Sequence, residues 1–125
     1  SMHKVKDATE NYLEAILILE EKEPRVRSIE LSKHLGVSRA SVSTAVKKLS
    51  SENYIDVAPN GVLLLTEKGR TLAESVYERH CLLRTFLLNI GVSEACAERD
   101  ACKLEHALSG ESHQKLKEYV ATLKK

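Results

Sequence analysis

The chain has 125 residues, of which 42% are hydrophobic and 30% are charged, and its formal net charge is +1. This length accommodates one domain or two small ones, and the composition is typical of a helix-rich soluble protein rather than of a disordered or fibrous chain. No apolar run approaches the roughly 18 residues that cross a bilayer, and no signal peptide opens the chain, so we expect a cytoplasmic protein.

The first part of the chain predicts three helices. Apolar residues recur at helical spacing over about Asp7–Glu21, and Pro24 ends this helix. A short helix follows with Ser28 as its N-cap, and a third helix begins after Ser38. Gly36 lies in the short connection between them and can adopt the left-handed conformation, which is typical of a helix-turn-helix motif.

The next segment predicts a β-hairpin. Residues 54–57 and 62–65 are short apolar runs on either side of a turn that contains Asn60 and Gly61. A hairpin that follows a helix-turn-helix is a wing. The first part of the chain is therefore expected to be a winged helix-turn-helix.

Three further helices are expected after the hairpin, so the fold class is mainly α. A long helix runs from Thr66 to roughly Leu88, another runs from its cap Ser93 to Leu108, and the last begins at about Ser112. These helices carry more apolar residues than a winged helix can cover, which favours a second core across a dimer interface. The alternative is that they complete a monomeric bundle. The expected domains are residues 1–70 and 71–125.

The charged residues are distributed unevenly along the chain. The net charge is −3 over residues 1–24, +4 over residues 25–70 and zero over residues 71–125. In a helix-turn-helix the second helix enters the DNA major groove, where hydroxyl and Arg side chains contact bases and Lys side chains contact phosphates. The expected DNA contacts are Ser38, Arg39, Ala40, Ser41, Ser43, Thr44, Lys47, Lys48 and, at the wing tip, Asn60. The alternative is that Ser38 only caps the helix and that the other serines only face solvent.

Residues 98–106 carry side chains that suit a divalent transition metal. Four of them fall on one face of a helix with 3.6 residues per turn: Glu98, Cys102, Glu105 and His106. Imidazole and thiolate suit Fe(II), Zn(II) or Co(II), and carboxylates suit Fe(II) or Mn(II). His80 on the long helix, and Glu14 or Asn11 on the first, can complete the set. The alternative is that these are surface residues around a small buried cysteine.

Five segments of the chain carry motifs of a known family. They are ATENYLEAI (8–16), LGVS (35–38), LTEKG (65–69), RHCLL (79–83) and CKLEHALS (102–109). Together they cover nearly the whole chain and resemble the DtxR/MntR family of metal-dependent transcriptional repressors, which respond to iron or manganese. The resemblance implies a homodimer with an N-terminal DNA-binding winged helix. The helices after it form the metal-binding and dimerisation domain.

The resemblance also implies roles for individual residues. The metal ligands carried over are Glu14, His80, Cys102, Glu105 and His106, with Asn11 at the position of a further ligand and Glu98 as a candidate second metal position. Cys102 matches the iron-sensing branch, where manganese sensors carry Glu. Fe(II) is therefore expected to be favoured, with Mn(II) next and Zn(II) also able to bind. The residues expected at the dimer interface are Leu116, Tyr119, Val120 and Leu123.

We therefore predict a DNA-binding repressor of metal homeostasis genes, in which a divalent metal orders the homodimer for binding to double-stranded operator DNA. One alternative is a winged-helix regulator that responds to a small molecule without metal. Another is a small metallohydrolase, but the sequence contains no dedicated nucleophile and no Gly-rich phosphate loop. We expect no enzymatic activity, no small-molecule substrate and no membrane partner.

Overall fold

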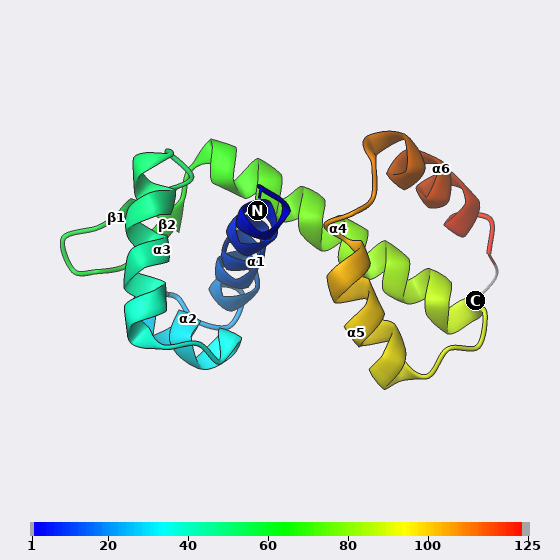
Figure 1. The fold of residues 1–125 in the computed structure, drawn as a ribbon, viewed down its shortest axis with the longest axis horizontal. Coiled ribbons are helices and arrows are strands. Elements are labelled where there is room, and N and C mark those ends of the chain that lie inside the picture. The colour runs from blue at the N-terminus through cyan, green and yellow to red at the C-terminus, as the bar shows by residue number, and fades with distance from the viewer. Residues whose placement is uncertain (1, 124–125) are drawn as a thin grey trace. The chain divides into compact units, whose positions relative to one another are not determined.

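The structure, a computed structural model, describes residues 2–123, and this part of the chain forms six helices and a two-stranded sheet (Figure 1). The elements are α1 (Met2–Glu20), α2 (Ser28–Leu35), α3 (Arg39–Ser51), β1 (Ile55–Val57), β2 (Leu63–Leu65), α4 (Glu67–Asn89), α5 (Glu94–Leu104) and α6 (Gly110–Val120). The predicted mainly helical fold is confirmed. The chain divides into two compact units, the first ending at Glu74 and the second beginning at Ser75. The boundary lies within α4, whereas the sequence suggested a division after residue 70.

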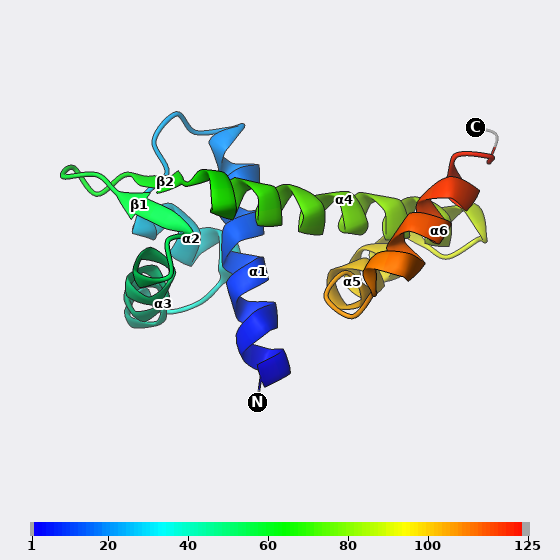
Figure 2. The ribbon, with the colours of Figure 1, turned by 90° about the horizontal axis from the view of Figure 1, so that it is seen from above.

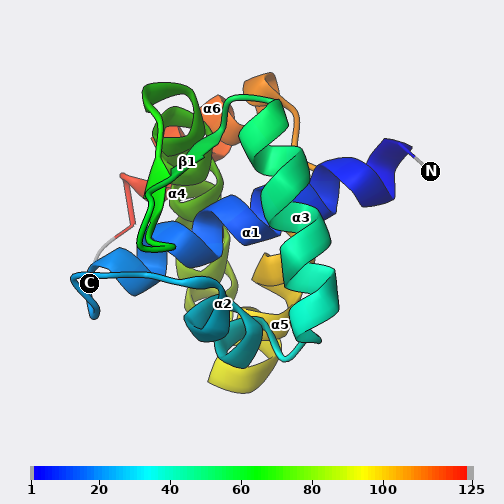
Figure 3. The ribbon, with the colours of Figure 1, turned by 90° about the vertical axis from the view of Figure 1, so that its left-hand side faces the viewer.

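The first unit has one hydrophobic core to which α1, α2, α3 and the hairpin all contribute. Its central side chains are at most 2% exposed, and they are Leu13, Ile16, Val26, Leu31, Val42, Leu49, Ile55 and Leu63. Figure 3 shows α3 lying across this unit, with α2 and the hairpin beside it. Because burying a Leu, Ile or Val side chain stabilises the fold by roughly 1.5–3 kcal/mol, this core fixes which face of α3 points outward.

The helix-turn-helix connection forms as the sequence predicts, with one correction. Gly36 has φ 68°, in the left-handed region, and Ser38 caps α3 by accepting a hydrogen bond from the Ser41 amide at 3.0 Å. Ser28, however, is the first residue of α2 and not its N-cap. The cap is Arg27, whose amide donates to Glu30 Oε1 at 2.8 Å, so the carboxylate three residues along supplies the acceptor.

The wing is a short antiparallel hairpin in which Ile55 pairs with Leu65 and Val57 with Leu63. Each strand is one residue shorter than predicted, and Gly61 has φ 86° in the turn. The Leu63 amide also donates to the Val26 carbonyl at 2.8 Å, which ties the hairpin to the segment before α2. The hairpin is thereby held against the helix-turn-helix.

In the second unit, α5 and α6 flank the later turns of α4 in the view of Figure 1, and Figure 2 shows both on the same side of α4. We expected α5 to reach Leu108, but it ends four residues earlier at Leu104. The Arg79 guanidinium of α4 donates to the Leu108 carbonyl, which holds the segment after α5 in a non-helical path. Ser109 then caps α6, which begins at Gly110 instead of Ser112. Within residues 2–123, no helix is long and apolar enough to cross a membrane.

Candidate functional site

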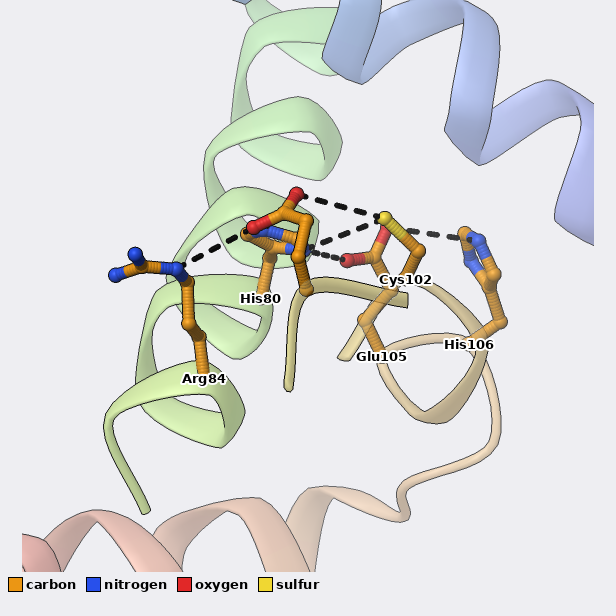
Figure 4. Close-up of polar contacts among 6 residues, drawn as sticks. His80, Arg84, Cys102, Glu105 and His106 are labelled. Carbon is orange, nitrogen blue, oxygen red and sulfur yellow. Dashed lines mark hydrogen bonds and ion pairs between the residues drawn. The ribbon is translucent and has the colours of Figure 1, made fainter. Parts of the chain in front are cut away.

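His80 of α4 is the centre of a polar cluster in the second unit (Figure 4). Its Nδ1 lies 2.9 Å from Glu105 Oε1, and its Nε2 lies 3.0 Å from Glu98 Oε2. Cys102 Sγ is 3.8 Å from His80 Nδ1 and 3.8 Å from Glu98 Oε2. The side chains of His80 and Glu105 are only 12% and 1% exposed, whereas that of Glu98 is 52% exposed. A neutral imidazole has one N–H and can donate to only one of the two carboxylates.

Glu105 is the most buried charged residue of this cluster, at 1% exposed. One carboxylate oxygen contacts His80, and the other, Oε2, lies 3.5 Å from His106 Nε2. Oε2 forms no hydrogen bond within the part of the chain that the structure describes. A buried carboxylate oxygen without a hydrogen bond destabilises a protein, and a bound cation removes that cost. The donor set of imidazole, carboxylate and thiolate therefore fits a divalent transition metal.

The local structure of α5 explains how these side chains come together. Ala97 and Ala101 are fully buried, and such small side chains allow α5 to lie close to α4. Glu98 and Cys102 are four residues apart on α5 and lie on its exposed surface. Their thiol and carboxylate groups thus point to the same side as His80.

The expectation that all four residues from 98 to 106 share one helical strip is wrong. Glu105 is the C-cap of α5, and His106 lies in the turn that follows the helix. This turn directs both side chains inward, and His106 is only 8% exposed. The cluster therefore combines two exposed helical side chains with two buried side chains from a turn.

Three side chains of the cluster, His80, Glu98 and Cys102, each place a ligand atom within 4.8 Å of the others. The structure thus brings together every predicted ligand of the second unit, including Glu98. Asn11 is exposed on α1, and Glu14 on the same helix is buried. Both belong to the first unit, and their role as ligands stays a prediction.

Arg84 was not among the predicted site residues, yet it contacts the cluster. Its Nε lies 3.4 Å from Glu98 Oε1, and its side chain is 40% exposed. Arg84 follows His80 by four residues on α4, so the helical repeat alone places both side chains on one face. That spacing was the signal by which the sequence could have identified it.

The second predicted surface is the outer face of α3 in the first unit (Figure 3). All of the predicted DNA-contacting residues are exposed: Ser38, Arg39, Ala40, Ser41, Ser43, Thr44, Lys47, Lys48 and Asn60. Ser38 and Ser41 are also hydrogen-bonded to each other through their hydroxyls at 3.0 Å, so they serve the cap as well as the surface. The exposed face of α3 is accordingly polar and basic, and the opposite face carries buried Val42 and Leu49.

Lys48 has a different setting from Lys47. It borders a hollow of about 600 Å³ within the first unit. The lining of this hollow includes Val5 and Glu10 of α1, Tyr54, and Leu72 near the start of α4. Tyr12 lines a smaller hollow beside it, and burial raises the pKa of the Tyr12 hydroxyl above its ordinary value. Lys48 therefore lies at the side of the α3 surface nearest to α1.

The wing tip is held by a residue that the sequence did not indicate. Arg27 Nε donates to the Asn60 carbonyl at 3.1 Å, and Asn60 Oδ1 accepts a hydrogen bond from the Val62 amide at 3.2 Å. The Asn60 amide side chain therefore shapes the turn. Because Arg27 is also the N-cap of α2, it joins the wing to the helix-turn-helix.

The residues predicted for the dimer interface lie at the end of the described chain. Leu116, Val120 and Leu123 are half-buried, and Tyr119 is 55% exposed. The rings of Tyr119 and Phe86 of α4 form a T-shaped pair, with 6.3 Å between the ring centres. Their role between two copies of the chain stays a prediction.

Comparison with known proteins gives two family matches that together cover most of the chain. Residues 4–63 match the N-terminal DNA binding domain of the iron dependent repressor family. Residues 66–125 match the metal binding and dimerisation domain of the same family. The first match ends and the second begins around β2, the second strand of the wing.

Individual relatives agree with these matches. An HTH-type transcriptional regulator of Methanocaldococcus jannaschii is 34% identical over 122 residues, which make up 96% of this chain and 98% of that protein. The transcriptional regulator MntR of Salmonella typhimurium is 37% identical over 109 residues, covering 86% of this chain and 68% of MntR. The solved structure of the manganese regulator SloR matches with a TM-score of 0.82 and 31% identity. That match covers 93% of this chain but only 54% of the SloR chain, so the present chain spans about half of that regulator.

The family inferred from the sequence motifs is thus confirmed by both domains and by whole-chain relatives. The helix-turn-helix and the first strand of the wing fall within the DNA-binding match, and the His80 cluster falls within the metal-binding match. The chain belongs to the iron dependent repressor family of metal-dependent, DNA-binding transcriptional repressors.

Proposed function

We propose that this chain represses transcription by binding operator DNA as a homodimer when its second unit holds a divalent metal ion. The observation that carries the proposal is Glu105, a carboxylate buried to 1% exposure whose Oε2 forms no hydrogen bond within the described residues. Family membership supplies the DNA-binding half of the proposal, together with the exposed basic face of α3. The alternative of a metal-independent regulator gives no reason for an unsatisfied buried carboxylate in this unit.

The residues of the second unit have distinct tasks in this proposal. His80, Cys102, Glu105 and His106 provide the ligand atoms, and Asn11 and Glu14 of α1 are proposed as further ligands on the family resemblance. The bound ion supplies positive charge that stabilises the convergence of carboxylate and thiolate groups. His80 orients Glu105 through the contact at Nδ1. Ser93 caps the first turn of α5, the helix that carries Glu98 and Cys102.

In the first unit, α3 is proposed to enter the major groove and the wing to lie against the neighbouring DNA backbone. A dimer places two recognition helices about 34 Å apart, which is one turn of B-DNA. The interface proposed for this dimer includes Leu116, Tyr119, Val120 and Leu123. A palindromic operator follows from the two-fold symmetry of such a dimer.

A selection from randomised DNA duplexes tests the proposal. Wild-type protein is incubated with the duplex pool in Fe(II) without oxygen, in Mn(II), in Zn(II), or in chelator, and the retained duplexes are sequenced. We expect one palindromic sequence to be enriched with metal and none with chelator. Equal enrichment in chelator, or no enrichment with any ion, contradicts the proposal.

The preferred ion is proposed to be Fe(II), with Mn(II) second. Cys102 carries this part of the proposal, since a thiolate binds Fe(II) or Zn(II) better than Mn(II), which prefers oxygen ligands. Cys102 is exposed and lies within 4 Å of both His80 and Glu98, where it can reach an ion in the cluster. SloR is a manganese regulator, which sets the competing expectation that Mn(II) is preferred.

Replacing Cys102 with Glu is expected to shift the preference from Fe(II) toward Mn(II). The carboxylate exchanges a soft ligand for a hard one and keeps a negative charge at the position. Affinity for the selected duplex, measured at a series of Fe(II) and Mn(II) concentrations, gives the preference of each protein. Cys81→Glu is the matched control, because Cys81 is also an exposed cysteine and is not a proposed ligand. A wild type that responds to Mn(II) alone, with an unchanged Cys102→Glu variant, would remove Cys102 from the ligand set.

A further inference from the structure

Arg84 places a permanent positive charge beside the group formed by His80, Glu98 and Cys102. Its Nε lies 3.4 Å from Glu98 Oε1, and α4 carries it one turn after His80. A guanidinium group is not deprotonated in proteins, so this charge is present at every working pH. A metal ion that binds to His80, Glu98 and Cys102 therefore lies next to the positive charge of Arg84.

Glu98 divides its two carboxylate oxygens between different partners. Oε2 faces the cluster, 3.0 Å from His80 Nε2 and 3.8 Å from Cys102 Sγ. Oε1 faces Arg84. A divalent ion held by His80, Glu98 and Cys102 therefore shares Glu98 with the guanidinium, and the two positive charges repel each other.

The other side of the His80 ring has no such competitor. There Nδ1 lies 2.9 Å from Glu105 Oε1, and Glu105 pairs only with His80 and His106 among the residues that the structure describes. Its Oε2 still lacks a hydrogen bond within those residues. The two nitrogens of one imidazole thus face two carboxylates, of which Glu98 is paired with Arg84 and Glu105 has no Arg or Lys partner among the described residues.

We propose that Arg84 sets the number of divalent ions that the second unit binds. By holding Glu98 in an ion pair, it favours tight binding on the Glu105 side of His80, where Cys102 Sγ lies 3.8 Å from Nδ1, and weakens binding of a second ion on the Glu98 side. The predicted second metal position at Glu98 is thereby weakened in the wild-type protein. This inference rests on the proposed function, because it assumes that the cluster binds metal.

Cobalt titration of the wild type, Arg84→Gln and Arg99→Gln tests the proposal. Calorimetry counts the Co(II) ions per chain, and the thiolate-to-Co(II) absorption reports whether Cys102 is engaged. We expect one tight ion per chain in the wild type. Arg84→Gln is expected to gain a second event about fivefold tighter than any weak second event of the wild type, in line with a partly exposed ion pair.

Arg99→Gln is the matched control, because Arg99 is an exposed residue of α5 and its loss changes the net charge equally. It is expected to titrate like the wild type, as is Arg84→Lys, which keeps the positive charge. Adding Glu98→Gln to Arg84→Gln is expected to abolish the second event. This double variant shows whether the gain passes through Glu98.

The outcomes separate this inference from the proposed function. If the wild type binds one Co(II) ion and Arg84→Gln titrates identically, Arg84 does not set the ion number and only this inference fails. Two equally tight ions in the wild type also overturn it. If the wild type binds no Co(II), the proposed metal function fails, and the role of Arg84 fails with it.

Discussion

Glu105 and Glu98 are two carboxylates on opposite sides of one imidazole, and their surroundings differ sharply. The Glu98 side chain is 52% exposed and pairs with Arg84, whereas that of Glu105 is 1% exposed and pairs only with histidines among residues 5–123. Burying a carboxylate costs several kcal/mol unless an opposite charge and hydrogen bonds compensate it. A bound cation would therefore reduce the free-energy cost of burial more for Glu105 than for Glu98.

Substitution of Glu105 by Gln is expected to remove most of the stabilisation that metal gives. Co(II) at 100 times its dissociation constant is expected to raise the free energy of unfolding of the wild type by about 2.7 kcal/mol. The neutral amide is a poor ligand, so the variant loses most of this increase. In chelator the variant is expected to stay within about 1 kcal/mol of the wild type, because Gln keeps an acceptor for His80.

Thermal unfolding with Co(II) and with chelator measures both quantities. Glu74→Gln is the control, since Glu74 is exposed on α4 and the substitution removes the same charge. An equal rise in stability with Co(II) in Glu105→Gln and in the wild type would show that Glu105 is not a ligand.

Among the elements, α3 and the wing form a surface whose geometry is determined by buried side chains and by hydrogen bonds within the first unit. Val42 and Leu49 bury one side of α3, Ser38 caps its first turn, and Arg27 holds the wing tip at Asn60. These contacts leave the basic side chains of α3 at the surface, where long and flexible cations suit phosphate contacts better than base contacts. Phosphate contacts set affinity and salt dependence without reading sequence.

Replacing Lys47 or Lys48 with Ala is therefore expected to weaken binding to all duplexes about equally. Each substitution should also flatten the slope of log affinity against log salt concentration by about one unit, the value for one lost phosphate contact. Fluorescence anisotropy with the selected duplex and a scrambled one, at several salt concentrations, measures both effects. Lys33→Ala, an exposed lysine of α2, is the control. A loss confined to the selected duplex would mean that the lysine contacts bases instead.

At the scale of the whole molecule, local signals in the sequence predicted most elements, and tertiary contacts decided the remainder. Ser38 and Ser93 cap their helices as expected, because an N-cap acts on its own helix alone. The end of α5 could not be predicted, since Leu104 and Ala107 are good helix formers and no Gly or Pro follows until Gly110. A contact from α4, the bond from Arg79 to the Leu108 carbonyl, holds that segment.

The candidate site was likewise predicted in part from local sequence signals, and the rest depends on tertiary contacts. The motif that contains Glu105 and His106 identified the cluster, but only the fold shows that these two side chains are buried while Glu98 and Cys102 are exposed. The role of Arg84 depends on its distance from Glu98, a residue that follows it by fourteen positions and lies on another helix. Sequence spacing within one helix cannot give such a contact.

Metal held by the second unit is expected to control DNA binding by the first. Reciprocal coupling makes this testable in a single measurement, because a metal that tightens DNA binding must itself bind more tightly when DNA is present. Calorimetric titration of Fe(II), without oxygen, into the wild type alone and into its complex with the selected duplex gives the two metal affinities. We expect the affinity to rise at least tenfold in the complex, which corresponds to about 1.4 kcal/mol of coupling free energy. The same metal affinity with and without the duplex would contradict the claim.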